Sequence, residues 1–143
     1  MPIKNYTTKI DASVTVGKIQ AVLAKHGAKK IMIEYDECCN VSAVTFIIMT
    51  GKGMQGVRLP ADPERVLAVL QQQKVKADLQ QARRVAWRIL KDWLEAQLAL
   101  LETEMVTIDQ VMLPYFVTQS GDTYYDLYLQ NKLAIGYSDE SSR

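Results

Sequence analysis

Histidine and cysteine are scarce in this chain, whose 143 residues include one histidine, His26, and two adjacent cysteines, Cys38 and Cys39. Adjacent cysteines pair poorly with each other, and without a second pair they do not make a zinc site. We therefore expect two free thiols in a turn or strand edge in a reducing compartment, with an intermolecular or redox role as the alternative. No metal and no cofactor is expected.

The chain also lacks a charge imbalance and a long apolar run. Lys and Arg number 17 against 16 Asp and Glu, so a net charge of +1 provides no global basic field for nucleic acid. No apolar stretch approaches the ~18 residues of a membrane helix, and MPIKNYTTKI lacks the apolar region of a signal peptide. The composition, 48% hydrophobic, predicts one globular domain over residues 1–143. The lack of a signal peptide and of a membrane span predicts a location in the cytoplasm.

Sequence signatures of catalysis are missing as well. The chain contains no GxxxxGK[ST], no GxGxxG after a strand, no HExxH and no GxSxG. His26 is explained by the favourable position of a cation at a helix C-terminus. The acidic pairs Asp36-Glu37 and Asp139-Glu140 lie in turn or tail sequence, so they do not converge on a metal. We expect a protein that is not an enzyme.

Residues 1–75 predict an α+β unit with the element order β-α-β-β-β-α. Near alternation of Thr, Tyr and Ile predicts a strand over Ile3–Ile10. Helical spacing predicts a helix with Asp11 or Ser13 as its N-cap that runs to about His26, with Gly27 as its C-cap. Strands are expected over residues 30–35, 41–50 and 54–59, and a helix over residues 63–73. The three strands should form an antiparallel β-meander covered by helices.

Residues 76–105 contain no Gly or Pro and are rich in strong helix formers, so they predict one long helix. The segment 106–143 follows, with Thr107 as a helix cap and Pro114 as an interruption. Residues 123–133 fit a helix or a strand, and the spacing of their aromatic residues favours the helix. The terminal residues 138–143, SDESSR, are expected to fray.

The apolar arc of the long helix is wider than one core requires. We therefore expect a homo-oligomer, a dimer or a multiple of it, with an interface through Trp93, Leu94, Leu98 and Leu101. The alternative is a central helix surrounded by its own chain.

Another face of this helix carries Arg84 and Arg88, whose guanidinium groups lie about one turn apart and match the phosphates of a small ligand. Trp87 lies beside them as a stacking surface for a base. Lys91, Tyr115 and Tyr125 complete the predicted ligand-binding residues. The alternative is a solvated face with weak i,i+4 pairs, Arg88 with Asp92 and Lys91 with Glu95.

Three segments of the chain resemble small proteins encoded by phages and prophages: YTTKIDAS...VGKIQAVLAKHGAKKIMIEYD, RRVAWRILKDWLEAQLAL and LPYFVTQSGDTYYD. The resemblance covers residues 3 to 130. In size, in fold and in the lack of catalytic residues the chain resembles the Thoeris anti-defence (Tad-type) sponges. Those proteins oligomerise and sequester cyclic ADP-ribose signals, and some also sequester cyclic oligonucleotides. The resemblance implies a type of pocket, lined by Arg and aromatic residues near a subunit interface, and assigns no residue.

The leading hypothesis is therefore a phage-encoded anti-defence protein, acting in the host cytoplasm, that binds a small cyclic nucleotide without cleaving it. A second hypothesis is a phage protein-binding module that inhibits a host enzyme or assists recombination, since the broad apolar helix and the Tyr-rich C-terminal segment suit a protein interface. A third is a DNA-binding accessory protein, which the near-zero net charge makes the weakest of the three.

Overall fold

The structure is a computed structural model that describes residues 1–132. The tail 138–143, for which fraying is predicted, lies outside the described residues. Three strands form an antiparallel sheet in the order β1-β2-β3, which confirms the predicted α+β class and the β-meander. The strands are β1 (Lys30–Tyr35), β2 (Val41–Thr50) and β3 (Gly53–Arg58).

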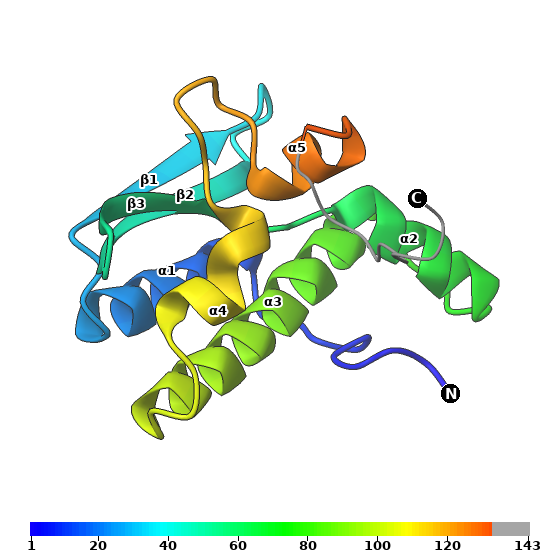
Figure 1. Cartoon of the computed structure of the whole chain (residues 1–143). Helices are drawn as coiled ribbons and strands as arrows, with labels where there is room; N and C mark the ends of the chain where they lie inside the picture. The colour runs from blue at the N-terminus through cyan, green and yellow to red at the C-terminus, as the bar shows by residue number, and fades with distance from the viewer. Residues whose placement is uncertain (133–143) are drawn as a thin grey trace, which may run out of the picture.

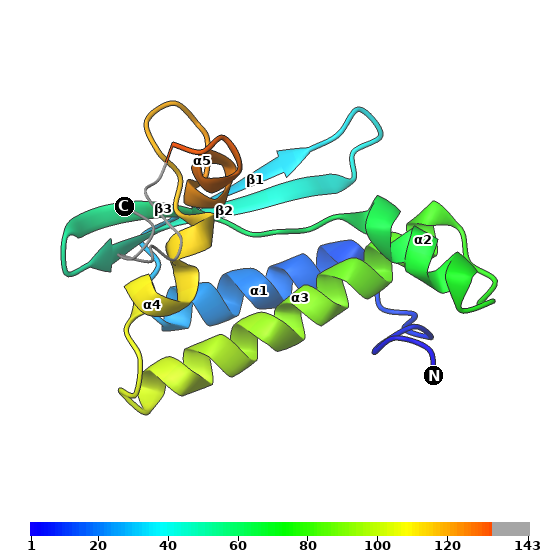
Figure 2. The same ribbon diagram turned by 45° about the vertical axis from the view of Figure 1, so that its right-hand side comes forward.

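One face of the sheet packs on helices α1 (Ala12–Lys25) and α3 (Leu79–Glu102), which run side by side beneath it (Figures 1 and 2). Alternation along β2 directs Val44, Phe46 and Ile48 to this face, where all three are buried. The opposite face carries Met32 and Met49, each more than half exposed. The core therefore lies between one side of the sheet and the two helices.

Helix ends coincide with capping residues. Gly27 follows α1 with a φ of +97°, a backbone conformation that glycine adopts without strain. Helix α2 (Pro63–Gln72) begins where the Asp62 carboxylate accepts from the N–H of Arg65 at 3.2 Å. The N-cap of α3 is Asp78, whose carboxylate accepts from the N–H of Gln81 at 2.8 Å. The cap makes α3 shorter than the predicted 76–105, with Thr103 at its other end.

Two short helices follow α3, each opened by a threonine capping box. Thr107 opens α4 (Ile108–Met112), and Pro114 lies in the 3-10 turn η1 (Leu113–Tyr115), so the predicted cap and interruption are confirmed. Thr123 opens α5 (Tyr124–Leu129), which confirms the helical interpretation there. Between these elements the chain runs along β3, where the N–H of Val117 donates to the carbonyl of Gly56 at 2.9 Å.

The predicted strand over Ile3–Ile10 is wrong, because this segment contains a turn and pairs with no strand of the described residues. Its polar groups bond to helix side chains instead. The N–H of Ile3 donates to Gln73 Oε1 at 2.9 Å, and Gln81 Nε2 donates to the carbonyl of Thr8 at 2.8 Å. The element order therefore begins with α1 and not with a strand.

The prediction that the wide apolar arc of α3 is shared with another subunit is wrong for two of its four residues. Leu94 and Leu98 are buried within the core of their own chain, and Trp93 and Leu101 are half-buried against it. Helices α1 and α2 both pack on α3, so one chain buries much of the apolar arc itself.

No helix within residues 1–132 combines the length and apolarity that a membrane crossing requires.

Candidate functional site

Arg84, Arg88 and Lys91 follow one another at helical spacing on α3 and form what we call the arginine face. All three are partly buried; the side chains of Arg84 and Lys91 retain 27% and 14% of their exposure. Lys91 pairs with Glu95, as predicted. The face is therefore a partly covered surface at which cationic groups meet other parts of the chain, and not a freely solvated one.

Arg84 connects α3 to the start of α1. Its Nη1 donates to Gln81 Oε1 at 3.0 Å, and its Nε lies 3.5 Å from Asp11 Oδ1. That second contact is an ion pair by distance but not a hydrogen bond, since the buried Nε has no hydrogen-bond partner within residues 1–132. Asp11 occupies the N-cap position of α1 without a side-chain capping bond, because its carboxylate points toward Arg84.

Arg88 is the least satisfied cation of this face. Its Nη1 is buried and finds no hydrogen-bond partner in the described part of the chain. The predicted ion pair with Asp92 is absent among residues 1–132, because Asp92 Oδ2 instead accepts from Asn5 Nδ2 at 2.9 Å and pairs with Lys4 Nζ at 3.1 Å. A buried guanidinium donor without a partner leaves hydrogen-bonding capacity for another group.

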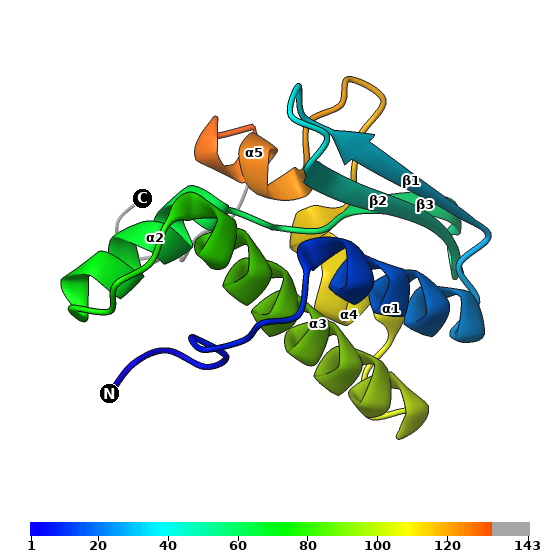
Figure 3. The same ribbon diagram turned by 180° about the vertical axis from the view of Figure 1, so that it is seen from behind.

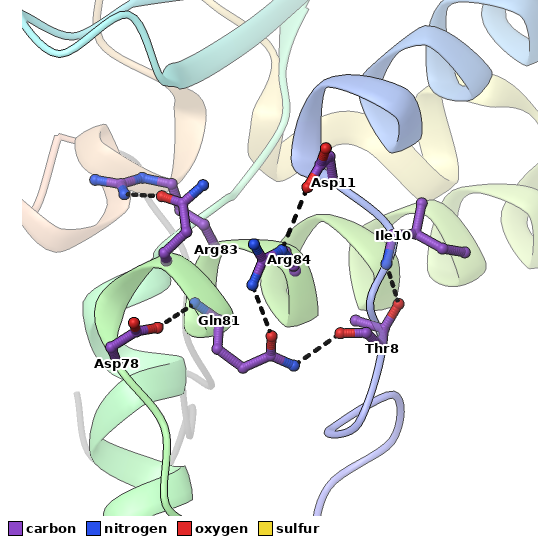
Figure 4. A network of polar contacts seen from close by, with 8 residues as sticks. Thr8, Ile10, Asp11, Asp78, Gln81, Arg83 and Arg84 are labelled. Carbon is purple, nitrogen blue, oxygen red and sulfur yellow. Dashed lines mark hydrogen bonds and ion pairs between the residues drawn. The ribbon is translucent and has the colours of Figure 1, made fainter.

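Residues 3–11 form a strap that runs from the end of α2 across α3 to the start of α1 (Figure 3). Figure 4 shows Gln81 at the centre of this contact, between Asp78, Arg84 and Thr8. Its Nε2 also approaches the carbonyl of Tyr6 at 3.2 Å. The strap is thus bonded to α3 at both ends of the arginine face, through Gln81 and through Asp92.

An open pocket of about 500 Å³ lies beside Arg84 at the beginning of α3. Its lining includes the cations Lys76 and Arg84, the carboxylate of Asp78 and the amide of Gln81. The sequence does not single out Lys76 or Gln81 as site residues. Both are polar residues near the start of α3, where the N-cap and the first helical turns place them beside Arg84.

The structure places Trp87 away from any ligand surface, which corrects the expectation that it stacks on a base. Its side chain is fully buried in the core, and its Nε1 has no partner among the described residues. Trp87 immediately precedes Arg88, and the helical rotation of about 100° between consecutive residues turns its indole toward α1 and the sheet.

The two predicted tyrosines do not line the pocket beside Arg84. Tyr115 meets Trp93 edge to face at 5.6 Å between ring centroids, within an apolar pocket of about 340 Å³. Tyr125 is half exposed on α5 and stacks on Tyr128. The predicted ligand residues therefore fall into four separate places, namely the arginine face, the core at Trp87, the apolar pocket at Tyr115 and the surface of α5 at Tyr125. Only the arginine face carries charge suited to phosphate.

A further pocket of about 590 Å³ lies at the opposite end of α3 and includes His26 and Glu102. His26 Nδ1 lies 2.9 Å from the carbonyl of Val22, and its Nε2 lies 2.8 Å from Glu102 Oε1. Both neighbours are acceptors, so only the imidazolium donates to both at once. The Val22 carbonyl, followed by the Glu102 carboxylate, accordingly raises the pKa of His26.

The raised pKa predicts a pH dependence of stability. Because the folded-state pKa lies above the ordinary value of 6.5, the contribution of His26 is complete below that value and is lost as pH rises through the raised pKa. Urea unfolding across this pH window should show the fall, and His26→Gln should remove it. His26 is the single histidine, so its NMR titration is unambiguous, and Glu102→Gln should lower the pKa. An unchanged pKa in that variant would contradict the assigned contact.

A second prediction concerns the strap. Burial raises the pKa of Asp92, but the bonds from Asn5 and Lys4 outweigh this and the net shift is downward. Asp92→Asn removes the charged acceptor, and charged hydrogen bonds contribute about 1.5–3 kcal/mol, so amide exchange in the strap should accelerate roughly tenfold or more. Hydrogen-exchange mass spectrometry of the peptide spanning residues 1–11 measures it.

The matched control for the strap is Glu95→Gln, which removes the next carboxylate along α3 without touching residues 3–11, since Glu95 pairs with Lys91.

Acidification should likewise accelerate amide exchange in the strap. The lowered pKa means that the contribution of Asp92 is present above the ordinary value of 3.8 and is lost as pH falls through the folded-state pKa. Equal exchange in the parent and Asp92→Asn would show that the strap is held by other contacts.

Within residues 1–132 no three His, Cys, Asp or Glu side chains come together in a way that suits a metal ion. Both cysteines are exposed and free in the turn between β1 and β2, as predicted.

Comparison of the chain with protein-family models, with curated proteins and with solved structures found no match.

Proposed function

We propose that this chain binds and sequesters a small cyclic nucleotide, of the cyclic ADP-ribose or cyclic oligonucleotide type, without cleaving it, as a phage-encoded anti-defence protein. The observation that carries the proposal is the pair Arg84 and Arg88. Each holds a buried guanidinium nitrogen without a hydrogen-bond partner among the described residues. Guanidinium groups one helical turn apart match phosphate oxygens in charge and in donor geometry.

The surroundings of the two arginines support an anionic ligand. The pocket beside Arg84 adds Lys76, and its volume of about 500 Å³ is within the range of small-molecule sites. The amide of Gln81 connects Arg84 to the strap, because its Nε2 donates to the carbonyls of Tyr6 and Thr8 while its Oε1 accepts from Arg84. A phosphate at Arg88 would lie under or beside the strap, so ligand binding should change the protection of residues 3–11.

The resemblance to Thoeris anti-defence sponges supports the choice of ligand class, and the unpaired guanidinium nitrogens support the arginine face as the proposed site. The test incubates the purified protein with cyclic ADP-ribose isomers and with cyclic di- and trinucleotides, removes free ligand, and releases bound ligand by heating. Intact nucleotide in the released fraction is the expected result. Cleaved product would indicate an enzyme, and failure to retain any member of the panel would reject the proposal.

A protein-binding role is the second candidate, and α5 is the observation that favours it. Tyr125, Tyr128 and Leu129 are each about half exposed or more on this single short helix. Exposed tyrosine is enriched at protein interfaces. One double variant distinguishes the two candidates. Tyr125→Ala/Tyr128→Ala should abolish capture of a host protein, while nucleotide retention stays at the parental level.

A further inference from the structure

In the part of the chain that the structure describes, the sheet has one covered edge and one open edge. On the β3 side, Val117 donates to Gly56, and Phe116 forms a bridge with Val57. On the opposite side, β1 hydrogen-bonds as a strand only to β2 within residues 1–132. Figure 1 shows β1 at this outer side of the sheet. An open edge presents unpaired N–H and C=O groups to which another strand can bond.

The hydrogen-bond pattern shows which groups of β1 face this edge. The N–H of Leu59 donates to the carbonyl of Val44 at 2.9 Å, so the polar groups of Val44 point toward β3. Backbone direction alternates along an antiparallel strand, so the next residue, Thr45, points toward β1. Thr45 lies opposite Met32, and Met32 is therefore bonded inward, toward β2.

By the same alternation, Ile31 and Ile33 direct their N–H and C=O groups to the open edge. Their side chains point to the core side of the sheet, where both are half-buried against the core. Met32 lies on the other face of the sheet, together with Lys30 two residues before it and Glu34 two residues after it. The strand is thus symmetric about Met32, with opposite charges at its two ends.

This symmetry makes β1 complementary to a second copy of itself. When two β1 strands pair antiparallel about a two-fold axis at Met32, Ile31 lies opposite the partner's Ile33 as a hydrogen-bonded pair. Lys30 lies opposite the partner's Glu34 in a non-hydrogen-bonded pair, where side chains approach more closely. The axis generates each contact twice, so a dimer contains two such ion pairs and two such isoleucine pairs.

We propose that the β1 edge is a homodimer interface that joins two three-stranded sheets into one six-stranded sheet. The occupant is a second copy of this chain because the charges of the strand match only when the partner runs antiparallel in this register. The existing contact of Glu34 with Arg58, 3.3 Å across the sheet, leaves the carboxylate 41% exposed and able to meet a second cation. The pairing also extends the isoleucine row of each core across the axis.

Charge reversal tests the register. Glu34→Lys alone places two lysines opposite each other at both ends of the interface, and Lys30→Glu alone does the same with two glutamates. Each single variant should raise the dimer dissociation constant roughly tenfold or more in sedimentation equilibrium. The double variant Lys30→Glu/Glu34→Lys restores both pairs and should return to the parental constant. Glu64→Lys is the control. It changes the net charge by as much as Glu34→Lys does, but at an exposed position of α2, so it should leave the dissociation constant unchanged.

A disulfide test locates the two-fold axis. In a background of Cys38→Ser and Cys39→Ser, Met32→Cys places two thiols at a non-hydrogen-bonded pair with Cα atoms about 4.5 Å apart, within disulfide range. Mild oxidation should yield a covalent dimer. Met49→Cys is the matched control, because it is equally exposed, at 56% against 54%, on the same sheet face but in the central strand. A monomeric parent at tens of micromolar, or equal crosslinking of the two variants, would overturn the proposal.

Discussion

Replacing Trp87 by alanine is expected to lower the free energy of unfolding by about 3–5 kcal/mol, the range for truncating a buried large aromatic residue. The indole has no exposed surface and is part of the core between α1, α3 and the sheet. Its loss leaves a cavity that rigid neighbours refill only in part. Urea unfolding followed by circular dichroism measures the change, because fluorescence would also change with the number of tryptophans.

Trp87→Phe separates packing from polarity. The buried Nε1 has no hydrogen-bond partner within residues 1–132, so removing it breaks no bond and ends the cost of an unpaired donor. The phenylalanine variant should therefore lose well under half of what the alanine variant loses. If Trp87→Ala had a small effect on stability and abolished nucleotide binding, the result would support Trp87 as a ligand-binding residue and contradict its position in the core.

Arg88→Ala is expected to weaken binding of the best-retained nucleotide by about 1.5–3 kcal/mol, or roughly ten- to a hundredfold in dissociation constant. Arg88 Nη1 is unpaired in the described chain, so its loss breaks no internal hydrogen bond of that atom. Stability should change by less than about 1 kcal/mol. Calorimetric titration alongside thermal melting gives both quantities on the same sample.

Three further variants make the assignment specific. Arg88→Lys keeps the charge but loses the planar fork, so it should restore binding only in part. Arg83→Ala removes an equal charge from the preceding turn, where Arg83 pairs with Asp36 at 3.5 Å, and should bind as the parent does. Arg84→Ala should weaken binding and also lower stability, because Arg84 connects Asp11 to Gln81. Parental affinity in Arg88→Ala would place the ligand elsewhere.

The local elements of this protein follow from its sequence. Thr107 and Gly27 mark helix ends as predicted, and Asp62 before Pro63 marks another, because a cap acts through backbone groups within a few residues of it. The antiparallel meander follows from three β-rich runs with turn sequence between them. These signals lie within windows of about ten residues, where sequence neighbours are also spatial neighbours.

The course of residues 3–11 was decided by tertiary contacts. Alternating Thr, Tyr and Ile suit a strand, but a strand needs a partner edge, and this segment instead meets side chains of α2 and α3. Asn5 and Asp92 are 87 residues apart in the sequence, so no local pattern announces their hydrogen bond. That bond takes the carboxylate that the i,i+4 rule assigned to Arg88.

The sequence by itself determined that α3 is helical and that it carries more apolar surface and more cationic charge than a simple surface helix. It did not determine which side of that helix meets which neighbour. Trp87 and Arg88 are adjacent in the chain, yet Trp87 is fully buried in the core and Arg88 is only partly buried. The difference arises because helical rotation separates consecutive residues by about 100°. Whether a given side of the helix is buried then depends on where α1, the sheet and the strap pack against it.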